Sequence, residues 1–195
     1  MWRGDSTWEQ CYPLQTRRLE RAVAELSELA TLDPLTGLWN RRVFMDRLTE
    51  EVSRFDRYGS PISLLMIDLD DFKTLNDSRG HAAGDDALRL LGRLIMGQFR
   101  VTDIAARYGG DEFGVILPGT NKTEAFATAE KLRSAVAGLG LDFGHKGRSG
   151  VVTASIGVAS AGPAAPDVDR LLEAADRALY RAKASGRDTV MLAPG

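Results

Sequence analysis

The chain has very little cysteine, almost no net charge and no long run of apolar residues. Cys11 is its only cysteine, so no disulfide can form within the chain, and a reducing compartment is the simplest expectation. No apolar stretch approaches the roughly 20 residues that span a bilayer, and the first residues lack the basic-then-apolar order of a signal peptide. We therefore expect a cytoplasmic chain without membrane contact, which could equally be the soluble part of a longer protein.

A surplus of charge of either sign is also missing. The chain carries 25 basic and 27 acidic residues, a net charge of −2. Bulk charge therefore does not predict nucleic-acid binding, and an anionic ligand must be held by a local group of side chains. With 195 residues, 44% of them hydrophobic, the chain can form one domain with a substantial core and a short extension.

The N-terminal segment is set apart by its pattern. Residues 1–13 have no clear period and stay unassigned. In residues 14–30, Leu19, Leu26 and Leu29 lie at helical spacings among polar residues, which predicts an amphipathic helix with a narrow apolar seam. Such a seam suits a two-stranded coiled coil, and hence a dimer stalk, but it suits a helix packed on its own domain equally well.

Residues 31–195 alternate between helix and strand patterns, which predicts an α/β domain with helices covering a mixed central sheet. Helices are expected at 40–58, 85–99, 123–136 and 168–185. Strands are expected at 62–67, 101–108, 113–117, 151–160 and 189–192. Loops are expected at 78–85 and 138–150.

The most informative stretch is Gly109-Gly110-Asp111-Glu112, which stands between two apolar runs. Apolar runs on both sides of a glycine pair predict a tight β-hairpin. The glycines would allow turn angles that side chains forbid, and they would leave bare backbone for a ligand. On its own, this tetrapeptide is better explained as an acidic, solvated turn.

A second acidic cluster follows the predicted strand 62–67. Asp68 comes directly after a continuous apolar run that reads as a buried central strand. Oxygen ligands at a rigid strand end suit a hard cation such as Mg²⁺, which makes Asp68 the metal-ligand candidate. Asp70, Asp71 and Asp77 are better explained as helix caps or loop residues. Lys73 is close enough in sequence to meet a phosphate, although a solvated lysine is the simpler explanation.

The amide of Asn76 and the carboxylate of Asp85 together could read a base edge. A carboxylate accepts two N–H groups, as the N1 and N2 edge of guanine supplies. His81, in the same stretch, reads more simply as a loop residue.

Several motifs occur in the order and spacing of one family, and from these the chain resembles the GGDEF family of diguanylate cyclases over about residues 31–192. They are Asp33-Pro34-Leu35-Thr36-Gly37-Leu38-Trp39-Asn40-Arg41-Arg42, Asp68-x-Asp70-x-Phe72-Lys73-x-x-Asn76-Asp77, Gly80-His81-x-x-Gly84-Asp85, Arg107-Tyr108-Gly109-Gly110-Asp111-Glu112-Phe113, Ala154-Ser155-Ile156-Gly157-Val158-Ala159, and the run from Ala174 to Asp188. The resemblance implies a palm-like fold and the condensation of two GTP molecules into cyclic di-GMP, with release of two pyrophosphates.

The resemblance also implies roles for single residues. Asp68, the Leu69 carbonyl, Asp111 and Glu112 would hold two Mg²⁺ ions per active site, for which Mn²⁺ could substitute. Asp111 would be the general base, with Lys73 and Glu112 as further catalytic residues. The substrate-binding residues would be Asn76, His81, Asp85, Gly109, Gly110, Lys183 and Arg187. Arg100 and Asp103 match the family's Arg-x-x-Asp site for inhibition by the product, for which a surface ion pair is the alternative.

Each such domain binds one GTP, so the resemblance implies a homodimer that brings two nucleotides together. Two other functions remain open. One is a catalytically idle receptor for GTP or cyclic di-GMP, although the residues that degenerate members lose are all present here. The other is a palm-like cyclase or polymerase that uses a different nucleotide.

Overall fold

The computed structural model describes residues 31–142, 144, 150–162 and 167–194. Residues 1–13 and the helix predicted at 14–30 lie outside them. The strands are β1 (Trp39–Asn40), β2 (Ile62–Leu69), β3 (Ile104–Arg107), β4 (Glu112–Pro118), β5 (Ala154–Ser160) and β6 (Val190–Leu192). The helices are α2 (Arg41–Tyr58), α3 (Phe72–Arg79), α4 (His81–Gln98), α5 (Lys122–Gly138) and α6 (Val168–Ala184). The predicted α/β class is confirmed.

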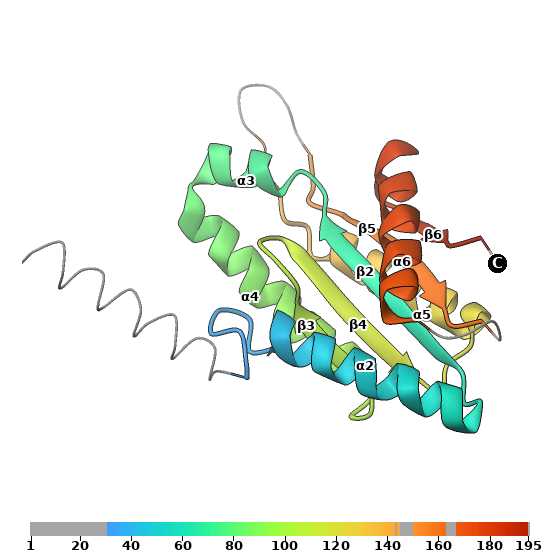
Figure 1. Cartoon of the computed structure of the whole chain (residues 1–195). Coiled ribbons are helices and arrows are strands. Elements are labelled where there is room, and N and C mark those ends of the chain that lie inside the picture. Colours follow the sequence, from blue (N-terminus) through green and yellow to red (C-terminus); the bar gives the residue numbers. More distant parts are fainter. Residues whose placement is uncertain (1–30, 143, 145–149, 163–166, 195) are drawn as a thin grey trace, which may run out of the picture. The chain divides into compact units, whose positions relative to one another are not determined.

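The six strands form one mixed sheet in the order β1-β3-β4-β2-β5-β6. Strand β2 runs antiparallel to both of its neighbours, β4 and β5, whereas the outer pairs β1–β3 and β5–β6 are parallel. Figure 1 shows α2 and α6 on one face of this sheet and α4 on the other. No helix in the described ranges is both long and apolar enough to cross a membrane.

Strand β2 is central because both of its faces are covered. All eight of its residues are buried. Leu65 and Ile67 belong to the core shared with α4 and α5, while Leu64 and Met66 belong to the core shared with α2 and α6. Side chains alternate along a strand, so Asp68 continues the second series and faces the α6 side.

Helix α2 begins and ends at the predicted residues. The Asn40 side chain accepts a hydrogen bond from the Val43 amide at 3.0 Å, which satisfies a free N–H of the first turn. Gly59 ends the helix at a φ of 69°, in the left-handed region that glycine adopts without strain.

The prediction of a loop at residues 78–85 is wrong. Helix α3 continues through Arg79 and α4 begins at His81, so Gly80 alone separates them, at a φ of 83°. Helix α4 therefore begins four residues earlier than expected, and His81 opens it instead of lying in a loop. The strand predicted at 101–108 is also too long, because β3 begins at Ile104 and Val101 is fully exposed.

Candidate active site

The hairpin between β3 and β4 is held by hydrogen bonds on both sides of its turn. The amides of Tyr108 and Gly109 donate to the Glu112 carbonyl at 2.8 and 3.2 Å. The Arg107 guanidinium donates to the Gly110 carbonyl at 2.8 Å and pairs with the Asp33 carboxylate at 3.2 Å. The predicted hairpin is confirmed, and the Arg107 side chain, itself paired with Asp33, holds its tip.

The two hairpin glycines do not have the angles that we expected. Neither Gly109 nor Gly110 has a positive φ, so the backbone here is open to any residue and the turn-angle argument is wrong. Lack of room for a side chain better explains the glycine at position 109. A Cβ on Gly109 would stand 3.0 Å from Oε2 of Glu112, whereas one on Gly110 would meet nothing within 4 Å. The Glu112 carboxylate therefore lies back over Gly109, and Gly110 stays open to a ligand.

Asp68 lies at the centre of an acidic cluster. It is the register partner of Glu112 across the β2–β4 pair, and the next residue, Leu69, donates its amide to the Asp111 carbonyl at 3.3 Å. Asp68 is 8% exposed and forms an ion pair of 2.6 Å with Nζ of Lys183 from α6. Strand β2 extends through Leu69, so Asp68 belongs to the strand instead of following it.

Burial raises the pKa of Asp68 to about 6, from an ordinary value of 3.8. The Lys183 ammonium lowers this pKa, while the negative charges of Asp111 and Glu112 raise it. Loss of hydration on burial is the main physical cause of the raised pKa, and repulsion from the two neighbouring carboxylates adds to it. The Lys183 ammonium therefore does not fully offset the negative charge of the cluster, and a further cation would be bound favourably there.

Asp176, on α6, belongs to the same surroundings and was missed from the sequence. Burial raises its pKa first, and the negative charge of Glu112 raises it further. Its spacing of seven residues from Lys183 places both on one face of a helix, which was the available signal. Lys183, rather than Lys73, is the cation in contact with the cluster in the described part of the chain, and Lys73 is exposed on the first turn of α3.

The carboxylate oxygens of this cluster can bind a hard cation, but only together with oxygen atoms from a bound ligand or water. No group of three carboxylate, imidazole or thiol side chains among the described residues is arranged to hold a metal ion by itself. Asp68 and Glu112 nevertheless supply two carboxylates from directly opposite positions of the β2–β4 pair. Mg²⁺ is bound typically by one or two carboxylates together with substrate phosphates and water, and the site matches that pattern.

The junction of α3 and α4 holds the predicted base-reading residues. Oδ1 of Asn76 is buried and has no hydrogen-bond partner, which is costly for an amide. The amide packs against Gly84, where an added Cβ would stand only 1.9 Å from that oxygen. His81 and Asp85 are exposed one turn apart on α4. Asn76 therefore presents an unpaired acceptor beside the first turn of α4.

Lys183 and Arg187, the predicted phosphate contacts, follow each other at the end of α6. Arg187 is exposed and lies in a turn at a φ of 65°. Its amide donates to the Ala182 carbonyl at 3.2 Å, which joins the turn to the helix. Figure 1 shows α3, the end of β2 and the C-terminal end of α6 at the same end of the sheet.

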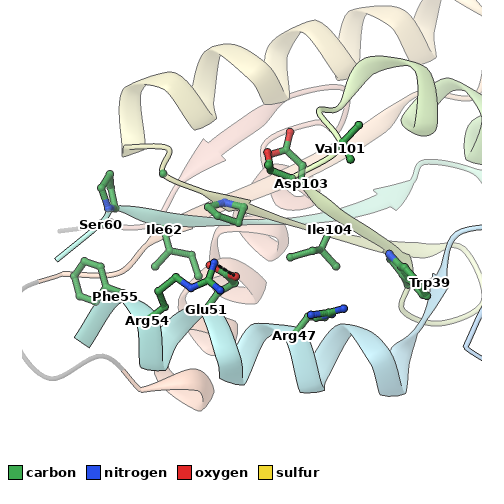
Figure 2. Close-up of a pocket in the computed structure, with 14 residues that line it drawn as sticks. Trp39, Arg47, Glu51, Arg54, Phe55, Ser60, Ile62, Val101, Asp103 and Ile104 are labelled. Atoms are coloured by element: carbon green, nitrogen blue, oxygen red, sulfur yellow. Dashed lines mark ion pairs between the residues drawn. The ribbon is translucent and has the colours of Figure 1, made fainter. Parts of the chain in front are cut away.

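Arg100 and Asp103 lie before β3, away from the cluster in the fold. The Asp103 carboxylate accepts from the Arg100 backbone amide at 2.9 Å, so it closes the turn instead of pairing with the guanidinium. A groove of about 450 Å³ is lined by Arg100, Asp103 and Lys131. Figure 2 shows a second groove, of about 570 Å³, with Asp103 on one wall and the Glu51–Arg54 ion pair of α2 on another.

Fold and site together define a palm-like α/β domain with an acidic centre beside a glycine hairpin. The chain belongs to the GGDEF family, described as the diguanylate cyclase GGDEF domain, whose model matches residues 30–189. The resemblance stated from the sequence motifs is thus confirmed.

Named relatives agree with this family. The chain is 42% identical over 164 residues to the response regulator PleD of Caulobacter vibrioides, and 41% identical over 165 residues to the diguanylate cyclase DgcP of Pseudomonas aeruginosa. Each match covers 84% of this chain but only 36% and 24% of the two relatives. The chain therefore spans about a third or less of their length.

Solved structures agree as well. The GGDEF domain of DgcB from Caulobacter crescentus, in complex with c-di-GMP, has a TM-score of 0.78 and 35% identity, covering 84% of this chain and 96% of that one. A structure of the DgcB coiled coil and GGDEF domain, also with c-di-GMP, has a TM-score of 0.77 and 32% identity, covering 96% of this chain and all of that one.

Proposed function

We propose that the domain is a diguanylate cyclase that condenses two GTP molecules into cyclic di-GMP. The observation that carries the proposal is the acidic cluster at the base of the hairpin, where Asp68 and Glu112 are register partners and Lys183 supplies a cation. The diguanylate cyclases among its relatives support the same reaction.

In each step, the 3′-hydroxyl oxygen of one GTP bonds to the α-phosphorus of the other. The bond to the bridging oxygen of the β-phosphate breaks and pyrophosphate leaves. The proton of the attacking hydroxyl must be taken up, and the Asp111 carboxylate at the hairpin tip is our general base. Two such steps close the ring, one for each nucleotide.

The metal ions would be bound by Asp68, the Leu69 carbonyl, Asp111 and Glu112, with the nucleotide phosphates completing their coordination. When bound, Mg²⁺ supplies positive charge to the phosphates and makes the attacking hydroxyl more acidic. We propose two Mg²⁺ ions per site, with Mn²⁺ as a substitute. The raised pKa of Asp68 supports this assignment, because a cation there would relieve the repulsion among the carboxylates.

The protein groups bind and orient the nucleotide. The Asn76 amide, whose Oδ1 is buried against Gly84, would turn to accept a guanine N–H, with Asp85 and His81 alongside. Gly109 and Gly110 would let the ribose and α-phosphate approach. Lys73 would offset charge that develops on the phosphates, and Lys183 and Arg187 would bind the terminal phosphates. This last role requires Lys183 to exchange Asp68 for phosphate oxygens when the nucleotide and metal bind.

A site of this kind holds one nucleotide, so we propose that two chains face each other as a homodimer. Product binding at Arg100 and Asp103 would give feedback inhibition. The groove beside them supports this site, and the c-di-GMP complex of DgcB supports binding of cyclic di-GMP by a domain of this family.

Product analysis tests the proposal. Purified protein, stripped of bound nucleotide, is incubated with GTP and Mg²⁺ beside an Asp111→Asn variant and an Asp46→Asn variant. Asp46 forms an exposed ion pair with the preceding turn of α2, so its variant controls for the loss of a carboxylate. We expect cyclic di-GMP from the wild type and the control but none from Asp111→Asn. A dimeric protein that binds GTP and forms no product would instead be the idle receptor.

A further inference from the structure

Asp70 is a buried carboxylate that no step of the proposed reaction uses. It is 3% exposed and accepts three hydrogen bonds. Ser155 Oγ donates to its Oδ1 at 2.7 Å, while Thr153 Oγ1 at 2.7 Å and the Asp188 amide at 3.0 Å donate to its Oδ2. Asp70 lies in the turn between β2 and α3, as the loop expectation had it, but its burial and its three partners were not expected from the sequence. It joins the end of β2 to β5 and to the turn after α6.

That turn has an unusual backbone. Gly186, Arg187 and Asp188 have φ values of 116°, 65° and 43°, so two successive residues with side chains lie in the left-handed region. Residues with a Cβ avoid this region, and two in succession must be held by other contacts. The turn presents Arg187, which we have assigned to the terminal phosphates.

Two side chains hold Asp188 from opposite sides. Asp70 binds its backbone amide from inside the fold. Arg133 of α5 pairs with its carboxylate at 2.6 Å on the surface, and this contact raises the pKa of Arg133. Asp188 is thereby fixed at both its amide and its carboxylate, which leaves its neighbour Arg187 little freedom at the backbone.

We propose that Asp70 is a positioning residue for Arg187, with Arg133 as the outer anchor of the same turn. The two anchors keep Arg187 in the left-handed conformation in which its guanidinium can meet the terminal phosphates of a nucleoside triphosphate. The proposal rests on the proposed function, since it takes Arg187 as the phosphate contact.

A carboxylate suits this position because all three of its partners are donors. An asparagine can keep the Asp188 and Thr153 bonds with its single oxygen and turn its NH₂ group to the Ser155 oxygen, which can also accept. Asp70→Asn should therefore preserve most of the anchor, whereas Asp70→Ala removes all three bonds. The pair separates loss of the anchor from loss of the charge.

The test compares the binding of two nucleotides by titration calorimetry with Mg²⁺ present. Guanosine 5′-(α,β-methylene)triphosphate carries the terminal phosphates and cannot be cleaved, while GMP reports contacts to the base and ribose. Losing charged hydrogen bonds to phosphate costs about tenfold in affinity or more. We expect Arg187→Ala to lose about that factor for the triphosphate and less than about twofold for GMP.

Asp70→Ala should show the same selective loss of about tenfold, and Arg133→Met a smaller one of about threefold, while Asp70→Asn stays within about threefold of the wild type. Asp70→Ala combined with Arg187→Ala should bind the triphosphate no more weakly than Arg187→Ala alone.

Gly92→Ala controls for lowered stability, because its Cβ, far along α4, would stand 2.7 Å from the Thr36 carbonyl oxygen. This variant should leave the ratio of the affinities for the triphosphate and for GMP unchanged.

The outcomes separate the two levels of the proposal. If Arg187→Ala binds the triphosphate as the wild type does, Arg187 is not the phosphate contact, and that part of the proposed function fails. The positioning role is wrong if Arg187→Ala loses affinity for the triphosphate but Asp70→Ala does not. It is also wrong if Asp70→Ala loses affinity equally for the triphosphate and for GMP. Arg133→Met, a change at the helix surface, decides the same question if Asp70→Ala does not fold: unchanged triphosphate affinity would then refute the anchoring of the turn.

Discussion

Replacing Asp68 by asparagine is expected to make the ligand-free protein more stable at neutral pH. Burial raises the pKa of Asp68 to about 6, against an ordinary 3.8. The native state therefore binds a proton more tightly than the unfolded chain does, and the ionised carboxylate destabilises the native state above pH 6. A gap of about two pKa units corresponds to about 3 kcal/mol, which is an upper limit for the gain.

The sign of the pH dependence follows directly. Between pH 4 and 6 the native state holds a proton at Asp68 that the unfolded state has released, so this contribution raises stability as the pH falls from about 6 to about 4 and is nearly constant well above pH 6. Asp68→Asn removes this contribution. The variant should melt several degrees above the wild type at pH 7.5, with about 10 °C as the ceiling for a domain of this size. The difference should shrink toward zero near pH 4.

Melting curves recorded by circular dichroism from pH 4 to 7.5, without metal or nucleotide, would measure this difference. Asp46→Asn is the control, because it removes an exposed carboxylate whose side chain is 63% accessible. Taking the difference between wild type and variant removes the contribution of Asp176, whose pKa is also raised. A lower melting temperature for Asp68→Asn at pH 7.5 would refute the reasoning, since it would mean that the pair with Lys183 stabilises the fold by more than burial of the carboxylate destabilises it.

Three further changes test other parts of the site. Gly84→Ala should raise the KM for GTP about tenfold or more, because the new Cβ would stand 1.9 Å from Oδ1 of Asn76 and displace the amide. Gly97→Ala is the control on the same helix, because its Cβ would meet nothing within 4 Å, and it should leave KM unchanged. Equal effects of the two substitutions would contradict this role of Gly84. Arg100→Ala should abolish inhibition by added cyclic di-GMP while the initial rate stays within about twofold, and inhibition that persists would remove this residue from the site. Lys183→Met should shift the pH dependence of melting to higher pH, because the ammonium lowers the pKa of Asp68, and an unchanged profile would argue against the ion pair.

The sequence predicted those elements whose signals are local. Strand β2 is a continuous apolar run, and the cap at Asn40 and the breaker at Gly59 delimit α2. The hairpin follows from two apolar runs around a glycine pair. In each case the residues that determine the structure lie within a few positions of one another, so the pattern is sufficient.

Helix α3 and the junction at Gly80 could not be predicted in this way. Only Leu75 is buried in α3, so its eight residues have no apolar period to reveal a helix. The polar stretch before Asp85 then read as a loop, although it contains the first turn of α4. The hairpin glycines were misinterpreted for a different reason, since a glycine in a sequence does not say whether angle or space requires it.

The roles that depend on distant partners were hidden as well. Asp70 meets Asp188, 118 positions away, and Lys183 meets Asp68 across the sheet. The sequence favoured Asp68 as the metal ligand because it directly follows the apolar run, but nothing near Asp70 in the sequence indicates that its carboxylate anchors a distant turn. Here they are two residues apart on one strand end and face different elements.

The unfavourable features of this domain gather at one end of its sheet. Asp68 is a buried carboxylate with a raised pKa, Asn76 has a buried oxygen without a partner, and Arg187 lies in a left-handed turn. Local rules are broken in folded proteins chiefly at functional sites, where a ligand gives something in return. Each cost has a matching ligand group: a cation would relieve Asp68, a guanine N–H would satisfy Asn76, and a phosphate would engage Arg187. Guanosine triphosphate bound with a metal ion carries all three groups, so the ligand we propose would account for three separate departures from an otherwise regular fold.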